Sequence, residues 1–106
     1  MNIDIFAKNL ELNAPLREFI EGKMSDIEHL LGSVGPVHIR VEVGVPSHHH
    51  SSGSIYYAET NITISGGDLL RAEATNYDLH AAIVDVKNEL KGQIKKFKEK
   101  KGNPHA

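Results

Sequence analysis

The chain contains no cysteine among its 106 residues. A disulfide framework and a metal site built on thiolates are therefore excluded. Its apolar runs are also short, because none approaches the roughly 20 residues that a membrane-spanning helix needs. Residues 1–4 lack the basic start and the apolar stretch of a secretory signal peptide. These absences lead us to expect a cytoplasmic protein with no membrane association.

Patterns typical of enzymes are missing as well. Gly66-Gly67 is not followed by the GK[ST] of a phosphate-binding loop. No arrangement offers both a nucleophile and an oriented base, so we expect no catalytic residues, no cofactor and no small-molecule substrate. The three tyrosines, at positions 56, 57 and 77, do not form the aromatic platform that stacks single-stranded bases. Any nucleic-acid binding should therefore read the backbone and its shape.

Three consecutive histidines, His48 to His50, are the strongest hint of a metal site. Consecutive histidines rarely converge on one ion without other ligands, and carboxylates are sparse nearby. We therefore expect no metal and interpret the segment as a polar loop. A metal-dependent enzyme or carrier built on this loop remains a competing hypothesis.

The hydrophobic pattern changes period several times along the chain. Alternation of apolar and polar residues indicates strands, and spacing of three to four residues indicates helices. Asn13 before Pro15 predicts a helix start, and Gly32 predicts its end. The pattern predicts six elements: a strand over 2–8, a helix from Asn13 that is ended by Gly32 and Gly35-Pro36, strands over 37–45 and about 55–65, a fourth strand after a tight turn at 66–67 with Leu70, Ala72 and Ala74 on one face, and a helix over about 77–100.

Each predicted strand has one apolar and one polar face, as in a sheet that is covered by helices on one side only. We therefore expect an α+β fold: a β-α-β-β-β-α two-layer sandwich, with a four-stranded sheet and two helices on one face. The length favours one domain. We assign it to residues 1–101 and expect residues 102–106 to be a short disordered tail.

Charge is distributed unevenly along the chain. Residues 1–86 carry five Lys and Arg against 12 Asp and Glu, a formal charge of −7, whereas residues 87–106 carry seven Lys against two Glu, a charge of +5. This asymmetry indicates either a basic patch that binds a polyanion or a solvated helix end.

A helical wheel locates the basic residues of the second helix. With Leu79 at zero, the apolar residues form one stripe, and a flank about 80–160° round is free of Asp and Glu. Cations near a helix C-terminus also complement its dipole, but that effect does not require them on one flank. The flank carries four lysines with a histidine beside them: Lys87, Lys91, Lys95, Lys98 and His80. Four lysines over three turns span about 16 Å, which suits several phosphates along an RNA backbone.

Lys23 is unusual because it falls within the apolar stripe of the first helix, among residues such as Phe19, Met24 and Leu30. One interpretation is a side chain that covers the edge of the core with its methylenes. The other is a lysine at the rim that reaches toward the same ligand as the second helix.

Two stretches resemble a known family. The first runs from Asn9-Leu10-Glu11-Leu12 through Leu16-Arg17-Glu18-Phe19-Ile20 to Lys23. The second begins at Leu70-Arg71-Ala72-Glu73-Ala74 and ends at Gln93-Ile94-Lys95-Lys96. In order and spacing the chain resembles the short form of the ribosome hibernation-promoting factor and protein Y family, also called the sigma-54 modulation family. The resemblance covers essentially residues 1–101.

The resemblance implies the same β-α-β-β-β-α fold, similar to a double-stranded RNA-binding domain. It also implies binding to the small ribosomal subunit and its rRNA, between head and body, where the protein overlaps tRNA and mRNA and silences translation in resting or stressed cells. Carried over by position, the RNA-binding residues are Lys23, Lys87, Lys91 and Lys95, with Lys98 continuing the stripe and His80 beside it. A monomer off the ribosome is expected.

The chain departs from the family at three positions. Asp26 stands where relatives commonly have a basic residue, His80 where many have Tyr, and Val84 where many have Asp. The first helix should therefore contribute less positive charge than in relatives. The competing hypothesis is a protein-interaction module of the sigma-54 modulation type, which would bind a protein partner and little RNA.

Overall fold

The computed structural model describes residues 2–34, 37–46 and 55–102. Within these ranges the element order is β-α-β-β-β-α, with a short 3-10 turn after the first helix. The elements are β1 (Ile3–Lys8), α1 (Ala14–Leu31), η1 (Gly32–Val34), β2 (Val37–Gly44), β3 (Tyr56–Ile64), β4 (Asp68–Asn76) and α2 (Leu79–Gly102). The predicted order and fold class are confirmed.

The four strands form one mixed sheet in the order β1-β2-β3-β4. β1 pairs with β2 in parallel, so the chain must cross over between them, and α1 is that crossover. The β2–β3 and β3–β4 pairs are antiparallel. Gly66 and Gly67 both have positive φ angles, which the hairpin between β3 and β4 requires.

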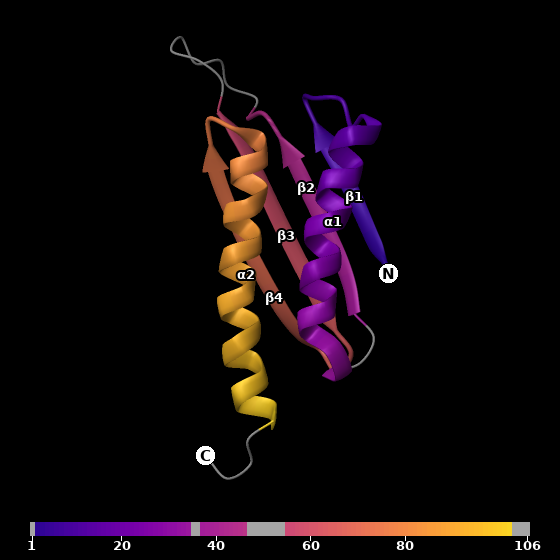
Figure 1. Ribbon diagram of the computed structural model, residues 1–106, viewed down its shortest axis with the longest axis vertical. Coiled ribbons are helices and arrows are strands. Elements are labelled where there is room, and N and C mark those ends of the chain that lie inside the picture. The colour runs from indigo at the N-terminus through magenta and orange to yellow at the C-terminus, as the bar shows by residue number, and fades with distance from the viewer. Residues whose placement is uncertain (1, 35–36, 47–54, 103–106) are drawn as a thin grey trace.

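Both helices pack on the same face of the sheet (Figure 1). The alternation predicted from sequence decides which strand residues point toward them, as Ile39, Val41 and Val43 do on β2. Helix residues at three-to-four spacing complete the core. The buried apolar set is Leu16, Ile20, Met24, Ile27, Leu31, Ile39, Val41, Val43, Ala58, Ile62, Ile64, Ala72, Ala82, Ile83, Val86, Leu90 and Ile94.

The predicted ends of the helices are close to the observed ones. The Asn13 side chain caps α1, accepting a hydrogen bond from the Leu16 N–H at 2.9 Å, and Gly32 follows its last residue with a φ of 56°. Helix α2 begins two residues later than predicted, where the Asp78 side chain accepts from the His80 N–H at 3.0 Å. It continues through Gly102, and residues 103–106 of the predicted tail lie outside the described residues.

Within the part of the chain that the structure describes, neither helix has the length and apolar character needed to cross a membrane.

Candidate nucleic-acid interface

The facing flanks of α1 and α2 run side by side along the sheet (Figure 1). Pairs of side chains bridge the two helices at several levels. We call this surface the helix seam and define it by Phe19, Lys23, Asp26 and Leu30 on α1 and His80, Lys87 and Lys98 on α2. Lys91 and Lys95 belong to the same predicted flank of α2. Four of the six predicted RNA-binding residues therefore lie along the seam, and the surroundings of the six differ.

An aromatic cluster lies at the seam where both helices begin. The rings of Phe19 and His80 meet edge to face with their centroids 4.3 Å apart. The Lys23 ammonium lies 5.1 Å from the Phe19 centroid, which is cation–π geometry. Lys23 is half-buried, as expected of a side chain that covers the edge of the core, and its contact with a ligand stays a prediction.

Lys87 is the most enclosed of the four lysines on the predicted flank of α2. Its ammonium donates a hydrogen bond to the Asp26 carboxylate on α1 at 2.7 Å, and the Lys87 side chain is only 18% exposed. This hydrogen bond is the main reason why the pKa of Asp26 lies below its ordinary value, with smaller contributions from the charges of Lys87, Lys23 and His29. Asp26 is therefore ionised at neutral pH, and it compensates the charge of Lys87.

Lys98 contacts the far end of α1. Its ammonium donates a hydrogen bond to the backbone carbonyl of Leu30 at 3.1 Å. Carbonyls in the last turn of a helix lack intrahelical partners and carry partial negative charge, so a cation is favourable there. The side chain of Leu30 itself is 39% exposed, so its assignment to the buried stripe of the first helix was wrong.

Lys91 and Lys95 differ from these two lysines. Both are exposed, and neither ammonium makes a hydrogen bond or ion pair with any residue in the described ranges. They lie between the levels of Lys87 and Lys98 on α2. The predicted stripe thus contains two lysines that also hold α1 and two that face solvent.

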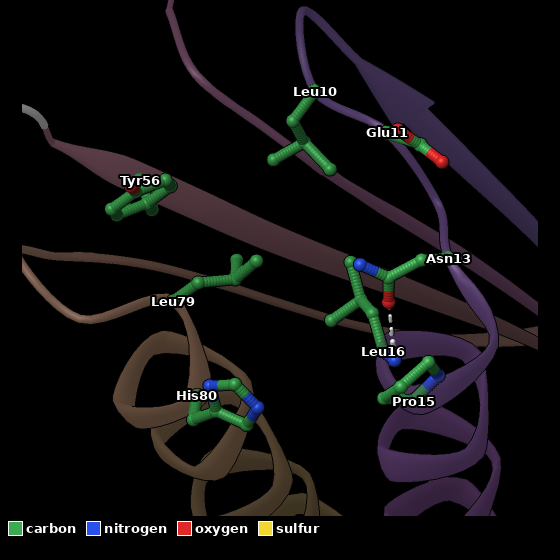
Figure 2. Close-up of a pocket in the computed structure, with 8 residues that line it drawn as sticks. All are labelled: Leu10, Glu11, Asn13, Pro15, Leu16, Tyr56, Leu79 and His80. Carbon is green, nitrogen blue, oxygen red and sulfur yellow. Dashed lines mark hydrogen bonds between the residues drawn. The ribbon is translucent and has the colours of Figure 1, made fainter.

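A shallow hollow opens beside the aromatic cluster (Figure 2). Its volume is about 310 Å³, and the side chains of Leu10, Leu16, Tyr56 and Leu79 make most of its wall apolar, with His80 at one side. The hollow contains no arrangement of titratable groups suited to catalysis. It does bring the beginnings of both helices to one place.

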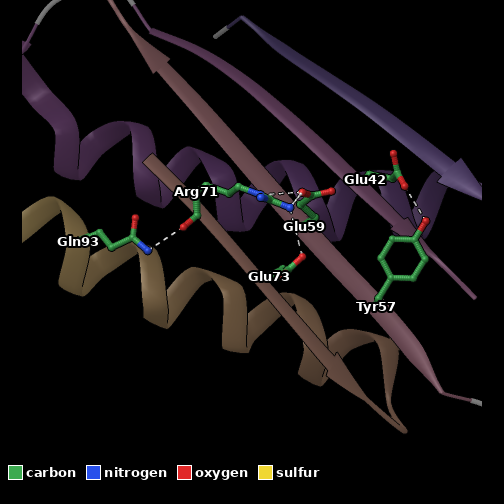
Figure 3. Close-up of polar contacts among 6 residues, drawn as sticks. All are labelled: Glu42, Tyr57, Glu59, Arg71, Glu73 and Gln93. Carbon is green, nitrogen blue, oxygen red and sulfur yellow. Dashed lines mark hydrogen bonds and ion pairs between the residues drawn. The ribbon is translucent and has the colours of Figure 1, made fainter. Parts of the chain in front are cut away.

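The outer face of the sheet, opposite the helices, has a different electrostatic character (Figure 3). Arg71 binds Glu59 through its Nε at 2.8 Å and also contacts Glu73 at 3.4 Å, while the Tyr57 hydroxyl donates to Glu42 at 2.6 Å. Glu59 and Glu73 thus lie on the outer face of the sheet. Arg40 on the same face lies over the Phe6 ring, 4.3 Å from its centroid, so this face carries charges of both signs and is not a uniformly basic surface.

The described residues contain no group of three or more His, Cys, Asp or Glu side chains placed to hold a metal ion. His48 to His50 lie outside the described residues. The tyrosines are separated from one another: Tyr56 lines the hollow, Tyr57 lies on the outer face, and Tyr77 is 74% exposed just before α2.

Sequence reasoning missed two partners in the seam. Phe19 was predicted only as a member of the apolar stripe of its helix, and its place at the edge of that stripe is the position expected for contact with a neighbouring helix. Asp26 was recognised as an acidic departure, but its pairing with Lys87, 61 residues away, was not. No sequence signal specifies that pair, because it depends on how the helices are placed side by side.

Comparisons with known proteins show what this chain is similar to. Residues 3–102 match the model of a family described as "Sigma 54 modulation protein / S30EA ribosomal protein". A ribosome hibernation promoting factor from Klebsiella oxytoca is 27% identical over 100 residues, which cover 94% of this chain and 96% of that protein. A ribosome hibernation promotion factor from Staphylococcus aureus (strain COL) is 29% identical over 98 residues, and these cover only 48% of that longer relative.

The fold has a counterpart among solved structures. The crystal structure of the Thermus thermophilus Protein Y N-terminal domain superposes with a TM-score of 0.75 at 28% identity, covering 92% of this chain and 99% of that one. The comparison supports the α+β assignment independently of the hydrophobic pattern.

Proposed function

Because the chain belongs to the family of sigma-54 modulation proteins and S30EA ribosomal proteins, we propose that it is a ribosome hibernation factor. It binds the small ribosomal subunit in the cytoplasm, contacts rRNA phosphates through the lysines along α2, and has no catalytic activity. Similarity to proteins named ribosome hibernation promoting factor supports this proposal. Off the ribosome, the protein is a monomer.

The observation that carries the proposal is the placement of charge on the two sides of the molecule. Lys91 and Lys95 are exposed on one flank of α2, with Lys98 and Lys23 nearby along the seam. On the outer sheet face, by contrast, carboxylates are paired with cations or hydroxyls. A polyanion such as rRNA is therefore attracted to the helical side.

The mechanism that we propose is occlusion. A domain whose helices are joined by contacts across the seam changes little on binding, so it occupies a fixed volume on the ribosome. Held by lysine–phosphate contacts where tRNA and mRNA would lie, it inhibits translation by excluding them. Lysine–phosphate contacts carry no base specificity, which suits a site defined by the shape of the rRNA.

The test is a double charge reversal, Lys91→Glu with Lys95→Glu, assayed by co-sedimentation with purified small subunits. These two exposed lysines make no hydrogen bond or ion pair with other described residues, so the domain should fold normally. Loss of two phosphate contacts should raise the Kd by about tenfold or more. Circular dichroism and thermal unfolding would verify the fold.

A matched control is available on the same helix. Lys96→Glu with Lys100→Glu makes the same change in net charge, at exposed positions on the other flank of α2. This control should bind nearly as well as the unaltered protein. Equal loss of binding in both double variants, or in neither, would contradict the assigned interface.

The competing hypothesis, a protein-interaction module, draws on the sigma-54 part of the family description. It predicts that a partner stays bound after ribonuclease treatment. Our proposal predicts that ribonuclease releases everything captured with the protein except fragments of the subunit.

A further inference from the structure

The ion pair between Asp26 and Lys87 occupies part of the proposed rRNA interface. Lys87 is one of the four lysines of the stripe, but its ammonium is already bound to a carboxylate at 2.7 Å. The two members of the pair differ in exposure: the Lys87 side chain is 18% exposed, and the Asp26 side chain is 58% exposed. An anion that approaches Lys87 from solvent therefore meets Asp26 as well.

Carboxylate and phosphate bind an ammonium in the same way, through anionic oxygens that accept charge-assisted hydrogen bonds. They therefore compete for the donors of Lys87. Asp26 is ionised at neutral pH. The charged groups that lower its pKa are all basic: Lys87, Lys23 and His29. The carboxylate thus reduces the positive potential at the level of the seam where it lies.

We propose that Asp26 is an affinity-setting residue, an intramolecular competitor that occupies Lys87 and weakens the attraction of the helix seam for rRNA phosphate. The inference rests on the proposed function and adds to it. It implies that this chain binds the subunit less tightly than its count of lysines indicates. Weaker attachment would favour release of the factor when translation resumes.

The test is Asp26→Asn, assayed by co-sedimentation with small subunits at several salt concentrations. Asparagine retains an oxygen that can accept from Lys87, so contact between the helices is preserved while the negative charge is removed. From the Coulomb energy of one charge near a phosphate in water, we expect the Kd to fall about three- to fivefold at low salt. The log–log slope of affinity against salt should steepen by about 0.7–0.9, the value for one additional phosphate contact.

Two further variants make the experiment specific. Glu18→Gln removes the same charge from α1 at an exposed position away from the seam, and it should leave the Kd nearly unchanged. In a Lys87→Met background, Asp26→Asn removes only the repulsion between the carboxylate and phosphate, so any gain in affinity should come without the steeper salt slope. A steeper slope that persists without Lys87, an equal gain from Glu18→Gln, or no gain from Asp26→Asn would each overturn the inference.

The unaltered protein separates this inference from the proposed function. Failure of the unaltered protein to sediment with small subunits at low salt would overturn the proposed function and the inference together. Sedimentation of the unaltered protein with no gain from Asp26→Asn would overturn the inference alone.

Discussion

Tyr57 illustrates how single residues on the outer sheet face are held by their neighbours. Its hydroxyl donates to Glu42 across the β2–β3 pair (Figure 3). Partial burial of the ring and, secondly, this hydrogen bond to a carboxylate raise the pKa of Tyr57 from 10.0 to about 12. Both effects favour the neutral phenol, so the folded state resists ionisation at this position.

A pH dependence of stability follows from the raised pKa of Tyr57. Because the folded pKa lies above the unfolded one, the stabilisation is fully present below pH 10 and is lost as the pH rises from about 10 to about 12. Tyr57→Phe should lack this component of the alkaline loss of stability. The difference in phenolate absorbance between the unaltered protein and Tyr57→Phe should titrate near pH 12. A difference titration centred at pH 10 would show that the hydroxyl is not held in this way.

At the scale of elements, the parallel pair β1–β2 depends on one close approach. Gly44, the last residue of β2, lies where a Cβ atom would come within 2.5 Å of the Lys8 carbonyl and 3.0 Å of the Tyr57 ring. No side chain fits there without moving backbone. Glycine at this position therefore lets β1 pair with β2 while the Tyr57 side chain keeps its hydrogen bond to Glu42.

Substitution Gly44→Ala should lower the free energy of unfolding by about 1–3 kcal/mol, the usual cost of overpacking. Gly22→Ala is the control: a Cβ at Gly22 meets nothing within 4 Å, and alanine is favoured within a helix such as α1. This control should raise the free energy of unfolding by up to about 1 kcal/mol. Denaturant unfolding would measure both. An unchanged free energy of unfolding for Gly44→Ala would mean that the strands can move apart at little cost.

At the scale of the whole molecule, the arrangement of charge matters more than its total. The formal net charge is −2, yet the exposed lysines of α2 and the paired carboxylates of the outer sheet face lie on opposite sides. A net negative protein can therefore approach a polyanion with one side only. In the proposed interaction with the ribosome, the orientation of the protein then follows from electrostatics before any contact forms.

The salt dependence of binding to the small subunit should show how many lysines contact phosphate. With Lys87 compensated by Asp26, four cations remain for phosphate: Lys23, Lys91, Lys95 and Lys98. The log–log slope should then be about −3, whereas five active cations would give about −4. Co-sedimentation over a range of salt concentrations measures the slope. A slope near zero would rule out phosphate contacts as the main source of affinity.

Local features of the sequence determined the elements of this protein. Alternation specified the inward residues of β1, β2, β3 and β4, and the Asn13–Pro15 pair specified where α1 begins, because these effects act over a few neighbouring residues. Helical spacing likewise placed the lysines of α2 on one flank. The candidate interface was thus predictable as a set of residues.

Only the tertiary structure decided what state each of those lysines is in. Lys87 meets Asp26 and Lys98 meets the Leu30 carbonyl because α1 and α2 pack side by side, whereas Lys91 and Lys95 face solvent. The partners in these contacts are 61 and 68 residues apart, and their approach depends on the packing of both helices on the sheet. Periodicity describes a helix relative to its own axis, so it specifies a flank but not the neighbour that the flank will meet.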